Sequence, residues 1–301
     1  MFKKILIANR GEIACRVKLP LALFAIVAGN AVHAQEAAAL LPIEIGSAHV
    51  LQSRPLGESR TVNVVFPASY RKETTKRYPV LYLIDGGIEQ DLLHVAGVAH
   101  LNALWGRSAE AIVVGIETRD RRRELVGPTR DPELLTKYPT AGASAAFRQF
   151  IRDEVKPLVE RSYRTSGEDV VLGESLAGLF VVETYLAEPA LFEGYAAIDP
   201  SLWWDKEALS RTAGSRVGDK QTGRRIYVAM AKEQVDEPAG ANRVIEGLRA
   251  KAQGWCVAAR PDLLHATIYQ QLTPQALQFL LPPAEAPPAE FGFEVKCSAK
   301  F

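Results

Sequence analysis

Strand-length apolar runs alternate with longer amphipathic stretches along most of this 301-residue chain. A continuous apolar run such as "YPVLYLIDGG" is typical of a strand that is buried on both faces of a sheet. Strand–helix–strand repeats need crossover connections, which favour a mainly parallel sheet with helices on both faces. The sequence therefore predicts an α/β fold. The expected strands lie within 60–70, 78–87, 110–117, 168–175, 194–201 and 224–233, and the expected helices cover 90–104, 144–163, 177–187, 241–253 and 273–281.

The alternating run "RTVNVVFPASY" differs from the others because it stops at Pro67, which suits an edge or early antiparallel strand. The charges are balanced, with 36 lysines and arginines against 35 aspartates and glutamates. A nucleic-acid partner would require a basic patch, and no long basic block is present. We therefore expect no nucleic acid as a partner.

Residues 18–34 have the three parts of a secretory signal peptide. Lys18 supplies the positive start, an apolar run follows, and small residues precede Gln35. The apolar run is too short to span a bilayer, so we expect a periplasmic or secreted protein with no stable membrane span after cleavage. Export permits a bridge between Cys256 and Cys297, although either could instead be a small buried residue.

The first 17 residues, "MFKKILIANRGEIACRV", resemble the start of the biotin carboxylase family of ATP-using ligases. The resemblance ends there, and one glycine without a following βαβ unit is a weak nucleotide-binding signal. We interpret 1–17 as a leader outside the functional chain, with translation starting at Val17. The predicted organisation is then a leader (1–17), a signal peptide (18–34), a catalytic domain (35–282) and a proline-rich extension (283–301).

The segment "DVVLGESLAGLF" carries the most informative motif. Strand-like residues lead into Gly173-Glu174-Ser175-Leu176-Ala177, and a helix-like run follows, as in the G-x-S-x-G nucleophile elbow with alanine at the last position. The small residues permit a tight turn that projects the serine into solvent. The alternative is a serine that only caps a helix. In this context Ser175 is the predicted nucleophile.

A serine nucleophile needs a base, which is usually histidine. His265 is the histidine that follows Ser175 in the sequence, as the order serine, acid, histidine requires. The acid is expected just after the strand "RRIYVAMA", where Glu233 is the first choice and Asp236 and Glu237 are alternatives. Each of these carboxylates could instead be a solvated loop charge.

The oxyanion of a tetrahedral intermediate needs two N–H donors. We expect one from the backbone of Leu176, directly after the nucleophile. The second is expected from Gly87 in "DGG", where the backbone can approach closely. The alternative is that Gly86 and Gly87 only form a turn.

Residues 44–282 resemble the putative-esterase family of α/β-hydrolases, which includes siderophore esterases and is related to formylglutathione hydrolases. The resemblance rests on "FPASY", "YPVLYLIDGG", "VVGIETRDRRRELVGPTRD", "GESLAGLF", "DPSLWWD" and "HATIY", in that order. It implies an α/β-hydrolase fold with Ser175 and His265 as catalytic residues. The family's acid is less constant, so a Ser–His dyad is also possible.

The same resemblance suggests residues that contact the substrate. Arg121 and Arg123 in "RDRRREL" would hold an anionic or catechol group, unless they belong to a solvated basic loop. Trp203 and Trp204 would form an aromatic wall for an aryl or acyl group, although core packing would explain one of the pair equally well.

We therefore expect a secreted serine hydrolase that cleaves a small-molecule carboxylic ester through an acyl-enzyme, without a metal or an organic cofactor. The alternatives are an acyltransferase on the same fold, or a catalytically silent α/β-hydrolase fold that serves as a binding protein.

Overall fold

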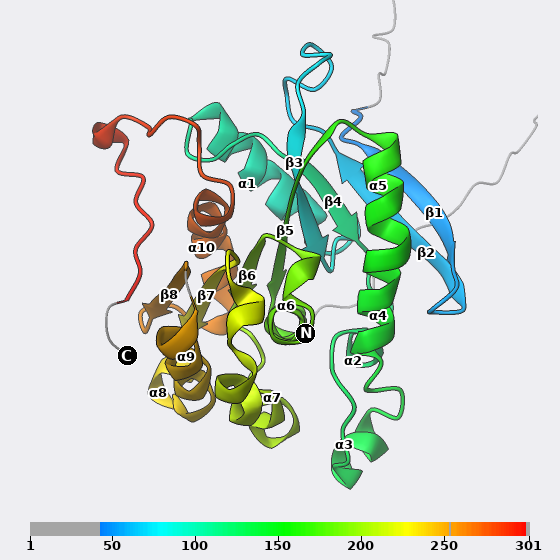
Figure 1. The fold of residues 1–301 in the computed structure, drawn as a ribbon, viewed down its shortest axis with the longest axis vertical. Helices are drawn as coiled ribbons and strands as arrows, with labels where there is room; N and C mark the ends of the chain where they lie inside the picture. The colour runs from blue at the N-terminus through cyan, green and yellow to red at the C-terminus, as the bar shows by residue number, and fades with distance from the viewer. Residues whose placement is uncertain (1–42, 253, 299–301) are drawn as a thin grey trace, which may run out of the picture. The chain divides into compact units, whose positions relative to one another are not determined.

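Eight strands form one sheet in the part of the chain that the computed structural model describes, residues 43–252 and 254–298. The predicted leader (1–17) and signal peptide (18–34) lie outside these residues. The sheet order is β1-β2-β4-β3-β5-β6-β7-β8 (Figure 1). The strands are β1 (Ser47–Ser53), β2 (Glu58–Val65), β3 (Tyr78–Ile84), β4 (Ile112–Ile116), β5 (Thr165–Glu174), β6 (Gly194–Ile198), β7 (Arg225–Ala231) and β8 (Trp255–Arg260).

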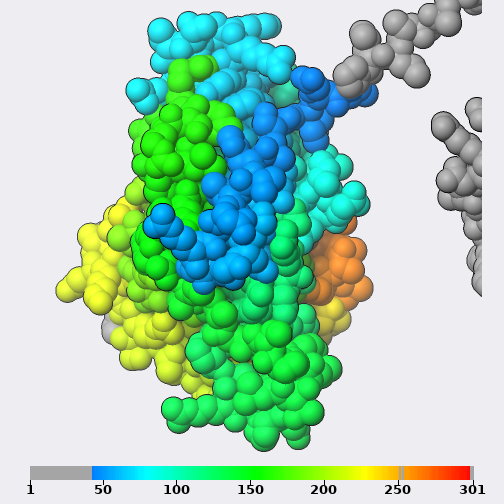
Figure 2. All heavy atoms as spheres, turned by 90° about the vertical axis from the view of Figure 1, so that its right-hand side faces the viewer, coloured from blue at the N-terminus to red at the C-terminus, as the bar shows by residue number. Residues whose placement is uncertain are grey.

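The sheet is parallel from β4 to β8, and its β1 end is antiparallel. Strand β2 pairs antiparallel with both β1 and β4, whereas all other neighbouring strands pair in parallel. The alternating run therefore forms an early antiparallel strand, as predicted, with β1 outside it as the edge. In Figure 2 the residues of β1 and β2 lie at the surface beside α5 (Lys156–Ser162).

Two hydrophobic layers cover the two faces of the sheet. Along β3, Tyr82 and Ile84 point into one layer and Leu81 and Leu83 into the other, because successive strand side chains alternate. The first layer packs against α4 (Ser144–Phe150), α6 (Leu176–Ala187), α7 (Trp204–Arg216) and α9 (Ala239–Lys251). The second packs against α1 (Leu92–Leu104) and α10 (His265–Leu280), which contact each other.

The expected helix over 144–163 is continuous from α4 through a π-helical turn at Ile151–Val155 into α5. Short helices complete the described fold: α2 (Arg121–Glu124), α3 (Pro132–Lys137) and α8 (Lys232–Asp236). None of the helices in the described residues is both long and apolar enough to cross a membrane.

The predicted start of the last helix at 273 is wrong, because α10 begins at His265. Its first turn is closed by the backbone N–H of Leu264, which donates to the Thr267 hydroxyl at 3.1 Å. Pro274 then lies inside the helix, where its missing N–H is tolerated although it removes one helical hydrogen bond. The earlier start places His265 at the N-terminus of a helix that packs in the second hydrophobic layer, rather than in a loop.

The C-terminal extension is tied to the edge of the sheet. Cys256 on β8 forms a disulfide with Cys297, which closes a segment with a sequence separation of 41 residues. The backbone N–H of Ser298 also donates to the carbonyl of Val257 at 2.6 Å. The two cysteines therefore form a disulfide, which is one of the two roles considered for them from the sequence.

Replacing Cys297 by alanine should lower the free energy of unfolding by about 2–4 kcal/mol, because the bridge restricts the unfolded chain over a loop of this length. Urea unfolding of the oxidised wild type, the reduced wild type and Cys297→Ala measures the effect. Reduction should lower the stability of the wild type and leave the variant unchanged. Equal stability of all three proteins would contradict this role.

Candidate active site

Polar side chains gather where the parallel strands end. Asp85 follows β3, Thr118 follows β4, Ser175 follows β5 and Asp199 follows β6. The hydroxyl of Thr118 donates to the carboxylate of Asp85, and this contact joins the ends of two neighbouring strands. The carboxyl ends of parallel strands are where α/β sheets bind ligands. This edge is therefore the candidate site.

Ser175 lies at a sharp turn between β5 and α6. Its φ of 59° and ψ of −117° are unusual for a residue that is not glycine. The turn is held from both sides, because the N–H of Ser175 donates to Ile198 at 3.0 Å and its carbonyl accepts the N–H of Ser201 at 2.9 Å. The strand–turn–helix geometry predicted for the motif is present.

The small residues of the motif are needed for close backbone contacts. A Cβ atom added to Gly173 would lie 2.7 Å from the backbone carbon and oxygen of Ala177. One added to Gly178 would lie 3.1 Å from the carbonyl oxygen of Ile198. Ala177 itself is fully buried, so its extra methyl group is accommodated in the core.

His265 lies at the same edge and is held by a buried carboxylate. Its Nδ1 is 2.5 Å from Oδ2 of Asp199, a residue that is 3 % exposed. The other oxygen of Asp199 accepts the backbone N–H of Ala231 at 2.8 Å and the side-chain amide of Gln234 at 2.5 Å. Asp199 is thus fixed in place and orients the imidazole.

The carboxylate beside His265 is therefore Asp199 rather than the predicted Glu233. After β7 the chain turns into α8, where Gln234 points toward Asp199 while Glu233 is exposed. Asp236 pairs with Lys232 at 2.5 Å, and Glu237 is exposed. Sequence reasoning missed Asp199, although it is the first charged residue after the buried strand "GYAAI".

Two further contacts involve the predicted nucleophile and base. Oγ of Ser175 is 3.3 Å from Oγ of the buried Ser201. Nε2 of His265 is 3.3 Å from Oε1 of Glu174, the residue just before Ser175. The structure thus brings Ser175 and His265 to one site, with a different polar partner on each.

The electrostatics of the site are dominated by carboxylates in a poorly hydrated environment. Burial raises the pKa of Glu174 to about 7, although the charges of His265 and Arg121 act in the opposite direction. Burial, reinforced by the charge of Asp85, raises the pKa of Asp91 to about 6. The hydrogen bond to Asp199 raises the pKa of His265, and the charge of Glu174 adds to this. Shifts of this kind are frequent at functional sites.

The two expected oxyanion donors differ in the structure. Leu176 is the first residue of α6, so its N–H has no acceptor within the helix and lies directly after Ser175. The N–H of Gly87 instead donates to the side-chain oxygen of Gln90 at 2.9 Å. Gln90 also donates to the carbonyl of Thr118, so the side chain of Gln90 links the turn at Gly87 to the end of β4. The Gly87 prediction therefore requires a donor that is already in use.

The two arginines predicted to bind substrate lie in different surroundings. Nε of Arg121 donates to Asp85 at 2.8 Å, and its Nη2 is 3.5 Å from the carbonyl oxygen of Glu174, so Arg121 borders the site. Arg123 instead pairs with Glu58 and Glu124. The structure thus brings Arg121, but not Arg123, to the nucleophile.

Trp203 follows Ser201 by two residues and is 59 % exposed. Its ring meets that of Trp204 edge to face, with ring centroids 6.0 Å apart. Trp204 is 5 % exposed and belongs to the hydrophobic core. The pair therefore divides as anticipated, with one core ring and one ring free to contact a ligand.

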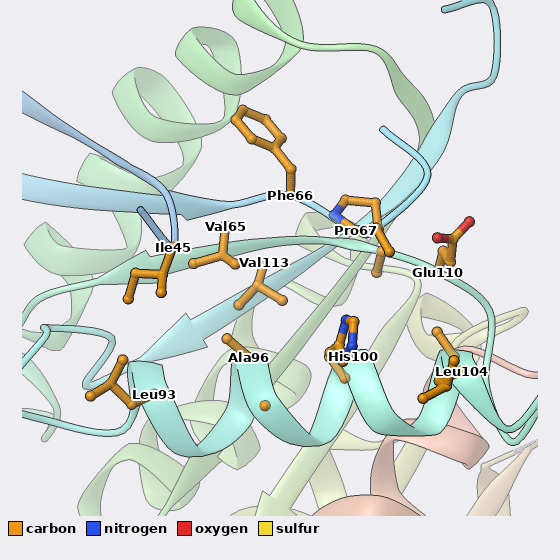
Figure 3. Close-up of a pocket in the computed structure, with 15 residues that line it drawn as sticks. Ile45, Val65, Phe66, Pro67, Leu93, Ala96, His100, Leu104, Glu110 and Val113 are labelled. Carbon is orange, nitrogen blue, oxygen red and sulfur yellow. The ribbon is translucent and has the colours of Figure 1, made fainter. Parts of the chain in front are cut away.

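A separate apolar groove of about 630 Å³ runs along α1 (Figure 3). Leu93, Ala96 and Leu104 of the helix face Val65 and Val113 across it. Its lining includes neither Ser175 nor His265 and contains no serine, threonine or cysteine. The groove therefore does not form part of the candidate site.

Comparison with known proteins gives consistent matches. The family model described as "Putative esterase" matches residues 53–252. The ferri-bacillibactin esterase BesA of Bacillus subtilis is 27 % identical over 201 residues, which cover 60 % of this chain and 68 % of BesA. The siderophore triacetylfusarinine C esterase of Aspergillus fumigatus is 24 % identical over 184 residues, which cover 55 % of this chain and 59 % of that protein.

Among solved structures, an IroE-like serine hydrolase from Shewanella oneidensis matches with a TM-score of 0.70 at 24 % identity. The match covers 78 % of this chain and 80 % of that one. The predicted α/β-hydrolase fold, with its mainly parallel sheet and helices on both faces, is confirmed.

Asp199→Asn should lower the kcat for an activated ester such as p-nitrophenyl acetate by about 10²- to 10⁴-fold, because the amide no longer favours the productive imidazole tautomer. Glu233→Gln makes the same change of charge on α8 and should retain most of the activity. Steady-state kinetics of both variants decide between the two carboxylates. A larger loss in Glu233→Gln than in Asp199→Asn would contradict the assignment.

Proposed function

We propose that this chain, which belongs to the putative-esterase family, uses Ser175, His265 and Asp199 to cleave carboxylic esters through an acyl-enzyme. The chain is a serine esterase. The observation that carries the proposal is the position of Ser175, at a positive φ between β5 and α6, next in sequence to Glu174, which contacts an imidazole that a buried Asp199 orients.

In the proposed reaction, Oγ of Ser175 attacks the ester carbonyl while Nε2 of His265 takes the hydroxyl proton. The tetrahedral intermediate carries its negative charge toward the N–H of Leu176. It collapses when His265 gives the proton to the leaving alcohol, which leaves an acyl group on Ser175. Water then attacks with the same base, and the acid and the free serine are released.

Asp199 has two roles in this scheme. By accepting Nδ1–H at 2.5 Å, it leaves the lone pair of Nε2 free to act as the base. Its negative charge also stabilises the imidazolium that forms during each proton transfer. Its own position is set by the hydrogen bonds from Ala231 and Gln234, so the imidazole has a fixed pivot.

We further propose an aryl or siderophore-type ester as the substrate class. One relative is named as a ferri-bacillibactin esterase and the other as a siderophore triacetylfusarinine C esterase, which supports this choice. Trp203 offers an exposed ring beyond Ser201, on which a catechol ring could stack. Arg121, whose side chain is 38 % exposed, offers a cation at the border of the site, but its Nε is bound to Asp85.

We also propose that the protein acts in the periplasm or outside the cell. The signal-like pattern of residues 18–34 supports export. The Cys256–Cys297 bridge adds independent support, because disulfides persist in oxidising compartments.

Ser175→Ala should abolish ester cleavage, with a loss in kcat/KM of about 10⁴-fold or more, because no hydroxyl remains to form the acyl-enzyme. Labelling of the protein with a fluorophosphonate probe should disappear at the same time. Circular dichroism and thermal unfolding should match the wild type, since alanine fits the same turn. A folded variant that still cleaves esters would identify another nucleophile.

The substrate class is tested by comparing a catecholate trilactone with p-nitrophenyl esters of short and long acids. We expect the highest kcat/KM for the trilactone. Trp203→Ala should raise the KM for it about 3- to 10-fold through lost ring stacking, while Trp203→Phe should largely restore it. Poor cleavage of the trilactone, beside efficient cleavage of simple esters, would exclude the siderophore-type substrate but not the esterase.

A further inference from the structure

The predicted base and nucleophile are not joined by a hydrogen bond in the structure, although both are among its described residues. Nε2 of His265 is 3.3 Å from Oε1 of Glu174. Oγ of Ser175 is 3.3 Å from Oγ of Ser201. The nitrogen that must accept the serine proton therefore faces the neighbouring carboxyl group instead.

We propose that Glu174 is a positioning residue, which holds Nε2 of His265 in the free enzyme and releases it to Ser175 when an ester binds. The proposal rests on the proposed esterase function. It assigns a role to the second residue of the Gly173-Glu174-Ser175 turn, which the reaction scheme itself does not use.

Glu174 and Ser175 are close enough for His265 to exchange one for the other. Glu174 and Ser175 are consecutive residues, so their Cα atoms are about 3.8 Å apart. The bond from Nδ1 to Asp199 provides a pivot at 2.5 Å, about which the imidazole can turn. The movement that the proposal requires is a rotation of the ring about this contact, which takes Nε2 from Glu174 to the next residue, Ser175.

The contact with Glu174 also makes the lone pair of Nε2 unavailable to the serine proton. A single proton between Oε1 and Nε2 lies either on the imidazolium or on the carboxyl group. In the first case His265 has no lone pair to accept the serine proton, and in the second the lone pair is used by the carboxyl O–H. The first arrangement keeps the site inactive until the proton leaves the imidazolium, and the second until Nε2 turns away from the carboxyl group.

Charged and titratable groups face this pair from every neighbouring element. Asp199 and Glu233 favour the imidazolium, and Arg121 favours the ionised form of Glu174. Asp91, before α1, disfavours that form. Tyr269, on α10, also faces Glu174. Because the side chain of Glu174 is only 18 % exposed, its contact with His265 is less screened than a surface pair would be.

The sign of the pH dependence follows from these charges. His265 must be neutral to act as a base, and its pKa is raised by the Asp199 hydrogen bond first and by Glu174 next. Activity should thus appear as the pH rises through the last proton loss of the coupled pair. Removing the Glu174 charge removes one of the groups that retain the proton, so activity should appear at lower pH.

The test is the pH profile of kcat/KM for p-nitrophenyl acetate between pH 5 and 9. Glu174→Gln should move the acid limb down by about one pH unit while the value at high pH stays within a few-fold of the wild type. Glu174→Asp keeps the charge and should restore most of the wild-type profile. Glu233→Gln removes the same charge without a hydrogen bond to His265 and should move the limb less.

An unchanged limb in Glu174→Gln, or an equal loss of activity at every pH, would overturn the proposal. Ser175→Ala separates the two hypotheses, because only retained activity in that variant would count against the esterase itself.

A second measurement does not depend on turnover. The chain has five histidines, so ¹⁵N imidazole NMR of the wild type beside His265→Ala identifies the His265 signals. We expect His265 to titrate above 6.5, with a second inflection from the coupled carboxyl group. A single titration step at or below 6.5 would overturn the proposal.

Discussion

Three neighbouring parallel strands, β3, β5 and β6, each end in a non-glycine residue with a positive φ. These residues are Asp85 at 59°, Ser175 at 59° and Asp199 at 42°. Such conformations cost about 1–3 kcal/mol each and persist only where the surroundings impose them. For two of them the sheet supplies the constraint, because the N–H of Ser175 donates to Ile198 on β6 and the N–H of Asp199 donates to Ala229 on β7. The geometry of the site depends on this register.

The loop that carries Arg121 depends on a contact formed elsewhere in the sheet. Arg60 on β2 is 1 % exposed and holds both oxygens of the fully buried Glu124 at 2.8 Å. Glu124 in turn accepts the backbone N–H of Arg119 at 3.1 Å. Bidentate pairs of this kind are geometrically specific, and loss of one partner leaves a buried charge. The antiparallel end of the sheet therefore fixes a segment that borders the nucleophile.

The sequence predicts features that depend on neighbouring residues and misses contacts between residues far apart in the chain. The strand–turn–helix at Ser175 is local, and chain order alone points to His265, so both are found from the sequence. Asp199 is missed because its partnership depends on how the ends of β6 and β7 align and on a side chain of α8. The pairing of Arg123 with Glu58 is also missed, because the two residues are 65 positions apart in the sequence. Pattern and spacing contain no information on such pairings.

Burial of the carboxyl groups at the site is electrostatically unfavourable. Burial raises the pKa values of Asp85, Asp91 and Glu174, so each carboxyl group binds its proton more tightly in the folded than in the unfolded chain. Unfolding then releases protons between about pH 4 and pH 7, and the contribution of these groups to stability falls as the pH rises through that range. A neutral His265 is favoured by the same rise in pH. The conditions that free the base are therefore those in which the buried carboxylates oppose folding most. The remainder of the sheet, with its two apolar layers, has to supply the stability that this edge lacks.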